Sequence, residues 1–263
     1  NALTQSCLNL SSIPSLDKGR VRVGFLNKMC YFRKEVFPNS RGNMQNSDEM
    51  RTLVPKKTPK RGYGGRSAEQ LAQERYERLM ASALELFGTV GYLPTTVEKL
   101  CAHAKVTPRH FYEHFKDREA ILIAVFNDIL QQSKHAVLSQ MLNGELSLEQ
   151  RFEAGVNAFL SAHLEDLRRV KITTQEILGV SQRVEAARNA AITEFALLIE
   201  SYLGLWVAAG KLPARNYKVL AFGLVGAMHE LQIAWLNKQV PQEKAVLVEE
   251  MAFLMSCLVK GVR

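Results

Sequence analysis

The sequence has few cysteines, no long apolar run and none of the short motifs that mark common enzyme chemistries. Its four cysteines, Cys7, Cys30, Cys101 and Cys257, form no C-x-x-C pair, which argues against a zinc knuckle or a disulfide scaffold and favours a reducing, cytoplasmic location. No stretch approaches the roughly 18 charge-free apolar residues that span a bilayer, so no membrane partner is expected. There is no G-x-S-x-G, P-loop or G-x-G-x-x-G, and His229-Glu230 lacks the second histidine of H-E-x-x-H. We therefore expect no enzyme, no catalytic residue, no metal site and no cofactor, with an all-helical enzyme as a less favoured alternative.

Positive charge is concentrated near the N-terminus. Residues 1–68 carry 13 basic and four acidic residues, whereas the rest of the chain carries 21 and 22. Residues 1–65 show no sustained period of 3.6 or 2, so we predict a basic, largely disordered extension there. Its last part, 51–66, fits either a solvated tail or an arm on DNA phosphates or the minor groove. One interpretation is that Met44 or Met50 is the natural start, which leaves open whether residues 1–43 belong to the native protein.

From Glu69 onward, apolar residues recur at helical spacing and helix ends carry capping signals. The first helix ends at Gly88 and Gly91, and its apolar face comprises Ala72, Tyr76, Leu79, Met80, Ala83 and Phe87. Thr95 is expected to open a short second helix, with Glu98 in capping-box register and Cys101 packed inward rather than acting as a redox sensor. Thr107 caps a third helix that begins at Pro108 and runs through Phe115; Asp117 caps a fourth that ends before Asn143-Gly144. The spacing of the second and third helices predicts a helix-turn-helix in an all-α chain.

The leading turn of the third helix would meet base edges in the major groove. Arg109 suits a bidentate contact to guanine, and His110 or Thr107 can bond a base or a phosphate. Tyr112 also fits a core position, although its phase differs from that of Phe111 and Phe115, and His114 fits DNA contact and a plain surface role equally. The residues expected at DNA are Thr107, Pro108, Arg109, His110, Tyr112, His114, Lys116 and Arg118.

Residues 83–129, ALELFGTVGYLPTTVEKLCAHAKVTPRHFYEHFKDREAILIAVFNDI, resemble the DNA-binding domain of the tetracycline-repressor (TetR/AcrR) family. The Leu-Phe-x-x-x-Gly-Tyr-x-x-Thr-Thr-Val and Phe-Tyr-x-His-Phe runs occur in the family's order and at its spacing. The resemblance implies a dimeric transcriptional regulator, usually a repressor, that leaves duplex DNA when a small molecule enters the C-terminal domain. It also implies DNA contact near Thr95 and Thr96 and backbone contacts from Thr96, Tyr112 and His114.

Three positions depart from the family pattern. Lys105 stands where a glycine commonly makes the turn, which predicts a slightly different turn. Arg109-His110-Phe111 replaces the common Gly-Thr-Leu or Pro-Thr-Leu, so the operator sequence cannot be transferred from relatives. Arg118 replaces the usual lysine.

The C-terminal half is predicted to be a helical ligand-binding and dimerisation domain. Ser147 with Gln150 caps a fifth helix, a short sixth surrounds 176–178, a seventh spans about 182–209, an eighth lies near 216–236 and a ninth begins at Pro241. This gives about nine helices, with a helix-turn-helix domain over 66–119 and a second domain over 120–263. In the resembling family the last two helices pair with those of a second copy in a four-helix bundle on palindromic DNA; alternatively, their apolar stripes pack inside the monomer.

A ligand cavity with a few polar groups is expected among the later helices. The candidates are Phe126, Phe152, Phe159, His163, Phe195 and His229, although each also fits an ordinary core position. The aromatic content favours an apolar or aromatic effector. The sequence thus predicts a ligand-released, homodimeric DNA-binding repressor. The alternative is a constitutive or nucleoid-type DNA-binding protein, which the nearly neutral body disfavours. The effector, the operator, the regulated genes and the choice between repression and activation cannot be read from the residues.

Overall fold

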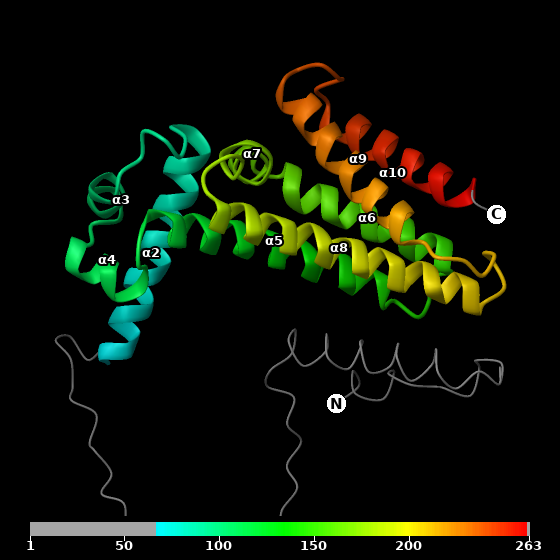
Figure 1. Ribbon diagram of the computed structural model, residues 1–263, viewed down its shortest axis with the longest axis horizontal. Helices are drawn as coiled ribbons and strands as arrows, with labels where there is room; N and C mark the ends of the chain where they lie inside the picture. Colours follow the sequence, from blue (N-terminus) through cyan, green and yellow to red (C-terminus); the bar gives the residue numbers. More distant parts are fainter. Residues whose placement is uncertain (1–66, 262–263) are drawn as a thin grey trace, which may run out of the picture. The chain divides into compact units, whose positions relative to one another are not determined.

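The computed structural model describes residues 67–261, and every regular element in that range is helical (Figure 1). The predicted extension over 1–65, its basic end over 51–66 and the alternative starts lie outside the described residues. Within them are nine α-helices and one π-helical segment: α2 (Ala68–Thr89), α3 (Val97–Ala104), α4 (Pro108–His114), α5 (Arg118–Met141), α6 (Leu148–Leu164), α7 (Leu167–Lys171), η3 (Ile172–Glu176), α8 (Gln182–Ala208), α9 (Lys218–Leu236) and α10 (Lys244–Lys260). The predicted all-α fold, with an N-terminal three-helix unit and a larger C-terminal helical part, is confirmed.

Side-chain caps set most helix starts. The Asp117 carboxylate accepts the Ala120 N–H at 2.7 Å, and Ser147 and Gln150 form the predicted capping box. Thr107 caps α4, which begins with Pro108 as predicted. Each cap satisfies backbone N–H groups that have no partner inside the helix, so these short polar residues fix where the helices begin.

Two predicted helix positions in the C-terminal part are wrong. The short helix expected around 176–178 lies earlier: Asp166 caps α7, and η3 then ends at Glu176. The last helix begins at Lys244 rather than Pro241. Before it, the Gln242 side chain donates to the carbonyls of Trp235 and Val240, which closes the α9–α10 connection over residues that would otherwise start the helix.

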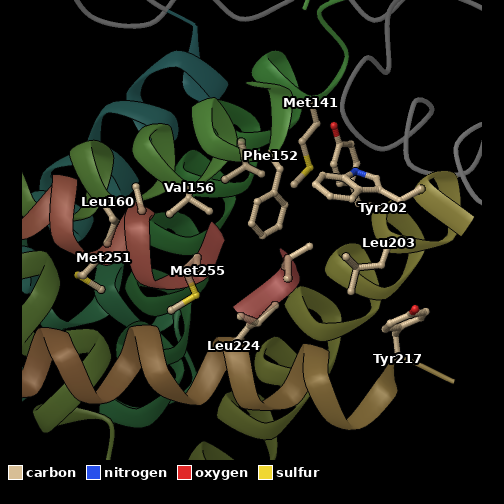
Figure 2. Packing of buried hydrophobic residues seen from close by; sticks show 14 of the residues in the cluster. Met141, Phe152, Val156, Leu160, Tyr202, Leu203, Tyr217, Leu224, Met251 and Met255 are labelled. Atoms are coloured by element: carbon tan, nitrogen blue, oxygen red, sulfur yellow. The ribbon is translucent and has the colours of Figure 1, made fainter. Parts of the chain in front are cut away.

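Two hydrophobic clusters make up the interior. The first joins α2, α3, α4 and the first half of α5 with Ile172, Ile177 and Val184. The second joins the end of α5 with α6, α8, α9 and α10, and Figure 2 shows Met141, Phe152, Leu203 and other members converging. The predicted domain boundary at residues 119 and 120 falls inside α5. That helix contributes to both clusters, so it belongs to both parts of the interior.

A polar layer lies between the two clusters on α5. Ile129 belongs to the first cluster and Val137 to the second. Between them, Ser133 and Lys134 are both buried: Ser133 Oγ lies 2.8 Å from His163 Nδ1, and Lys134 forms an ion pair with Glu194. Buried polar groups are tolerated only when they are hydrogen-bonded or paired, as these are.

Helices α8 and α9 are unusually apolar for their burial. Each has a window with the length and composition of a membrane span, with mean hydropathy 1.4 and 1.5, and only 28% and 22% of those windows are buried. Core helices of soluble proteins also pass this test. Apolar side chains remain exposed on α9 and α10, namely Val219, Phe222, Val246, Phe253, Leu254 and Leu258. Such a surface is typical of a contact with another protein chain.

Candidate nucleic-acid interface and ligand cavity

The turn between α3 and α4 uses a lysine in a left-handed conformation. Lys105 has φ 52° and ψ 48°, and the Val106 N–H closes the turn on the Cys101 carbonyl at 3.0 Å. Arg78 of α2 donates to the Lys105 carbonyl at 3.3 Å. Lysine therefore adopts the conformation that glycine favours, at a steric cost of roughly 1–2 kcal/mol.

Helix α4 has one buried side and one exposed side. Phe111 and Phe115 are 0% and 5% exposed, whereas Tyr112 is 57% exposed. The core position considered for Tyr112 is therefore wrong. The Arg109 side chain is 88% exposed, and Thr107, Pro108 and Lys116 also lie at the surface. The leading turn of α4 is thus free to approach another molecule.

Glu113 holds the two basic residues of that turn. His110 Nδ1 lies 2.9 Å from Glu113 Oε2, and Arg109 Nε lies 3.8 Å from Oε1. The hydrogen bond with His110 lowers the pKa of Glu113, so the carboxylate stays ionised. The exposed surface of α4 therefore combines a positive leading turn with one negative charge behind it.

Thr95 is the one predicted contact residue that the structure removes from the surface. It is fully buried, and its hydroxyl donates to the Gly91 carbonyl at 2.7 Å. The prediction that Thr95 opens the second helix is also wrong, because Thr96 caps α3 by accepting the Lys99 N–H. Thr96 itself remains exposed. Cys101 lies on the buried side of α3, and burial raises the pKa of its thiol, in keeping with a packed apolar role.

His114 and Arg118 are engaged within the chain. His114 is half-buried with its ring against Tyr76 of α2. Arg118 lies over the Tyr92 ring at 4.2 Å and donates to the carbonyls of Tyr92, Leu93 and Thr95, the last at 2.8 Å. It ties the segment before α3 to the start of α5. This role was not predictable from the sequence, since no local pattern distinguishes such an arginine from one that faces solvent.

All six predicted ligand-site residues line one cavity of about 110 Å³ in the C-terminal part: Phe126, Phe152, Phe159, His163, Phe195 and His229. Four polar lining residues were missed: Thr173, Thr174, Arg188 and Gln232. Two of these could have been found by helical spacing, because Arg188 lies seven residues before Phe195 and Gln232 lies three residues after His229.

Both cavity histidines are neutral at pH 7. His163 is 2% exposed and stacks on Phe159, and burial lowers its pKa to about 4, with Arg169 contributing. Burial also lowers the pKa of His229, and the charge of Arg188 lowers it further. Burial is thus the larger cause at both rings, and a nearby arginine adds to it.

The segment η3 touches both the cavity and the helix-turn-helix. Thr173 and Thr174 line the cavity. Two residues later, Glu176 Oε2 accepts the Tyr92 N–H at 2.7 Å, in the stretch that leads into α3. Lys171, just before η3, donates to the Thr89 carbonyl at the end of α2. A displacement of η3 would therefore act directly on the base of the helix-turn-helix.

Comparison with known proteins identifies the family. Residues 79–125 match the family model described as bacterial regulatory proteins, tetR family. Residues 79–125 are therefore similar to the DNA-binding part of TetR-family regulators. This confirms the resemblance seen in the sequence and indicates a DNA-binding transcriptional regulator rather than an enzyme.

The relatives of this chain are distant. The HTH-type transcriptional regulator YerO of Bacillus subtilis is 22% identical over 205 residues, which span 70% of this chain and 66% of YerO, about two thirds of its length. The fatty acid degradation regulator FadR of Bacillus halodurans superimposes with a TM-score of 0.64 at 19% identity, over 72% of this chain and 96% of FadR. Bacillus subtilis FadR, solved with stearoyl-CoA, gives a TM-score of 0.61 at 19% identity, over 72% and 100%. At these identities the structural likeness establishes the fold.

Proposed function

We propose that this chain is a cytoplasmic, homodimeric transcriptional repressor of the TetR family that binds a palindromic DNA operator and is released by an apolar small molecule. Residues 66–119 would form the DNA-binding domain and 120–263 the ligand-binding and dimerisation domain. The observation that carries the proposal is η3, because this one segment lines the cavity with Thr173 and Thr174 and holds the Tyr92 N–H with Glu176.

The exposed side of α4 supports the DNA-binding part. Arg109 at 88% exposure can reach guanine in the major groove, and His110, Tyr112 and Lys116 lie beside it to contact bases or phosphates. The ion pair between Glu113 and Arg109 would have to break before Arg109 could contact DNA. This exchange penalises phosphate-only contacts and favours sites where Arg109 gains a base partner.

The apolar surface of α9 and α10 supports the dimer. Val219 is 86% exposed and Phe253 is 65% exposed. A symmetric dimer would cover these side chains and place two helix-turn-helix units on one DNA, which requires a palindromic operator. Val219→Glu is compatible with the isolated fold because the side chain is exposed, but it would disrupt such an interface; sedimentation should then give a monomer.

The cavity supports control by a ligand. Bacillus subtilis FadR was solved with stearoyl-CoA, so an apolar effector is reasonable for this chain as well. The resting cavity of about 110 Å³ is smaller than the roughly 300–1,000 Å³ of drug-sized sites. A long ligand would have to spread the lining, including η3, and that movement would alter the hold of Glu176 on the helix-turn-helix.

Selection of bound sequences from random duplex DNA tests the proposal. We expect an enriched palindrome, followed by release of the complex by some members of an apolar compound set. A complex with no preferred sequence would contradict operator binding, and a complex that survives the whole set would contradict ligand release. Thr173→Val is the variant that should weaken release while keeping operator affinity.

A further inference from the structure

Three buried polar atoms in the cavity wall have no hydrogen-bond partner: Arg188 Nε, His229 Nε2 and Gln232 Oε1. They come from α8 and α9. Gln232 is only 3% exposed, and its amide nitrogen is already used by the Met228 carbonyl at 3.0 Å. An unsatisfied buried polar group destabilises the fold, so three at one site indicate a polar group that is supplied by a ligand.

The charge of the site selects among polar groups. Arg188 uses Nη1 to bind Glu185 at 2.8 Å, which leaves its Nε–H without an acceptor. Its side chain is 21% exposed. A charge-assisted hydrogen bond from guanidinium to carboxylate is about twice as strong as a neutral one. Most of the other lining residues are apolar, with Phe126, Phe159 and Phe195 among them.

We propose that the cavity binds an apolar carboxylic acid as its anion, with the carboxylate between Arg188 and His229 and the hydrocarbon part against the phenylalanines. This deepens the ligand part of the proposed function and rests on it. Gln232 Oε1 would accept a hydrogen bond from a hydroxyl or N–H beside the carboxylate. A volume of about 110 Å³ is close to the ~150 Å³ cavity that holds benzene, so the acid that fits the resting cavity is small.

Binding of the anion should be coupled to uptake of one proton. Burial and the charge of Arg188 lower the pKa of His229, while Glu230 and the backbone of Thr173 raise it; the net shift is downward and favours the neutral ring at pH 7. A carboxylate beside Nε2 raises that pKa, so the ring takes a proton from solvent and donates Nε2–H to the carboxylate.

The other groups around the cavity limit which side chain can take this proton. His163 faces it from α6, but its Nδ1 lies against Ser133 and Arg169 of α7 lowers its pKa. From η3 the backbone of Thr173 bonds the His229 ring, and α10 contributes Met255 to the lining. His229 is therefore the group expected to titrate.

Calorimetry on the full chain without DNA tests this inference. The probes are phenylacetate and hexanoate, each compared with its neutral amide. We expect both acids to bind at least about tenfold more tightly than their amides, which corresponds to ~1.4 kcal/mol. In buffers of different ionisation heat, uptake at pH 7 should be close to one proton per acid, and close to none in His229→Asn.

Variants locate the effect. Arg188→Met should lower acid affinity at least about tenfold and lower amide affinity by less, because the amide carbonyl loses only a neutral hydrogen bond. Arg183→Met is the matched control on the same helix, because Arg183 pairs with Asp117 and does not line the cavity. Arg188→Lys keeps the charge and should retain part of the preference for acids.

The outcomes separate this inference from the proposed function. Amides that bind as tightly as the acids, acids that do not bind, or an Arg188→Met variant that binds acids normally would each overturn it. Operator binding by wild type and by Arg188→Met without acid is measured in parallel. It should be equal, and it tests the DNA-binding role whatever the acids do.

Discussion

The hydrogen bond from Tyr92 N–H to Glu176 gives the sharpest test of how the two parts of the chain communicate. Glu176→Ala removes an acceptor 2.7 Å from a buried amide and an ion pair with Lys171 at 3.4 Å. The charge-assisted hydrogen bond is worth about 1.5–3 kcal/mol, and the partly exposed ion pair adds less than about 1 kcal/mol. We expect a loss of about 2–3 kcal/mol, which lowers Tm by roughly 5–10 °C in a domain of this size.

Two measurements check this value. Thermal unfolding gives the global effect, and hydrogen exchange at the Tyr92 amide gives the local one, with exchange at least about tenfold faster. Glu176→Gln keeps an acceptor and should fall in between. Glu153→Ala, an exposed glutamate on α6, is the matched control. Unchanged Tm and unchanged exchange at Tyr92 would refute the view that Glu176 holds the helix-turn-helix.

Four further outcomes follow from single side chains. Arg109→Ala should cost about 1–3 kcal/mol on the operator and relax the preference at one base position; equal losses on operator and random DNA would rule out base reading. Arg118→Ala should lower stability by about 2 kcal/mol and weaken DNA binding, while the dependence of log affinity on log salt concentration stays the same. A slope reduced by about one would instead indicate that Arg118 contacts a phosphate. Lys105→Gly should stabilise the fold by about 0.5–1 kcal/mol because φ is positive there, and a lower Tm would contradict this. The pKa of His163 is about 4 in the folded state and about 6.5 in the unfolded state, so protonation favours unfolding, and up to ~3 kcal/mol of stability should be lost as pH falls from about 6.5 to about 4. Denaturant titrations should show a smaller loss for His163→Asn. The same pH profile in wild type and variant would contradict this.

Local chemistry predicted most of the helix starts. Thr107-Pro108, Asp117 and Ser147 with Gln150 each satisfy backbone N–H groups within their own first turn, so no distant residue decides the outcome. Thr95 shows where this reasoning fails. Thr95 and Thr96 are both good caps, and the choice was made by packing, because the Thr95 hydroxyl bonds the Gly91 carbonyl inside the first cluster.

The cavity was predictable in part from the sequence. The contact that joins the cavity to the helix-turn-helix through η3 was not. The aromatic candidates share the inward phase of their helices, which the 3.6-residue period exposes. The π-helical segment has no such signal, since it depends on how α7 packs against α2. The roles of Glu176 and Arg118 likewise depend on partners 84 and 26 residues away along the chain.

The polar layer on α5 has a mechanical consequence. Helices α5 and α8 both run from one hydrophobic cluster to the other, but at Ser133 and Lys134 the material between the two interiors is hydrogen-bonded rather than close-packed and apolar. Tilting one cluster against the other at this level would open no void, because the hydroxyl and the ammonium can exchange one partner for another. At this level of α5 the two interiors therefore meet through exchangeable polar contacts, beside His163, which lines the cavity.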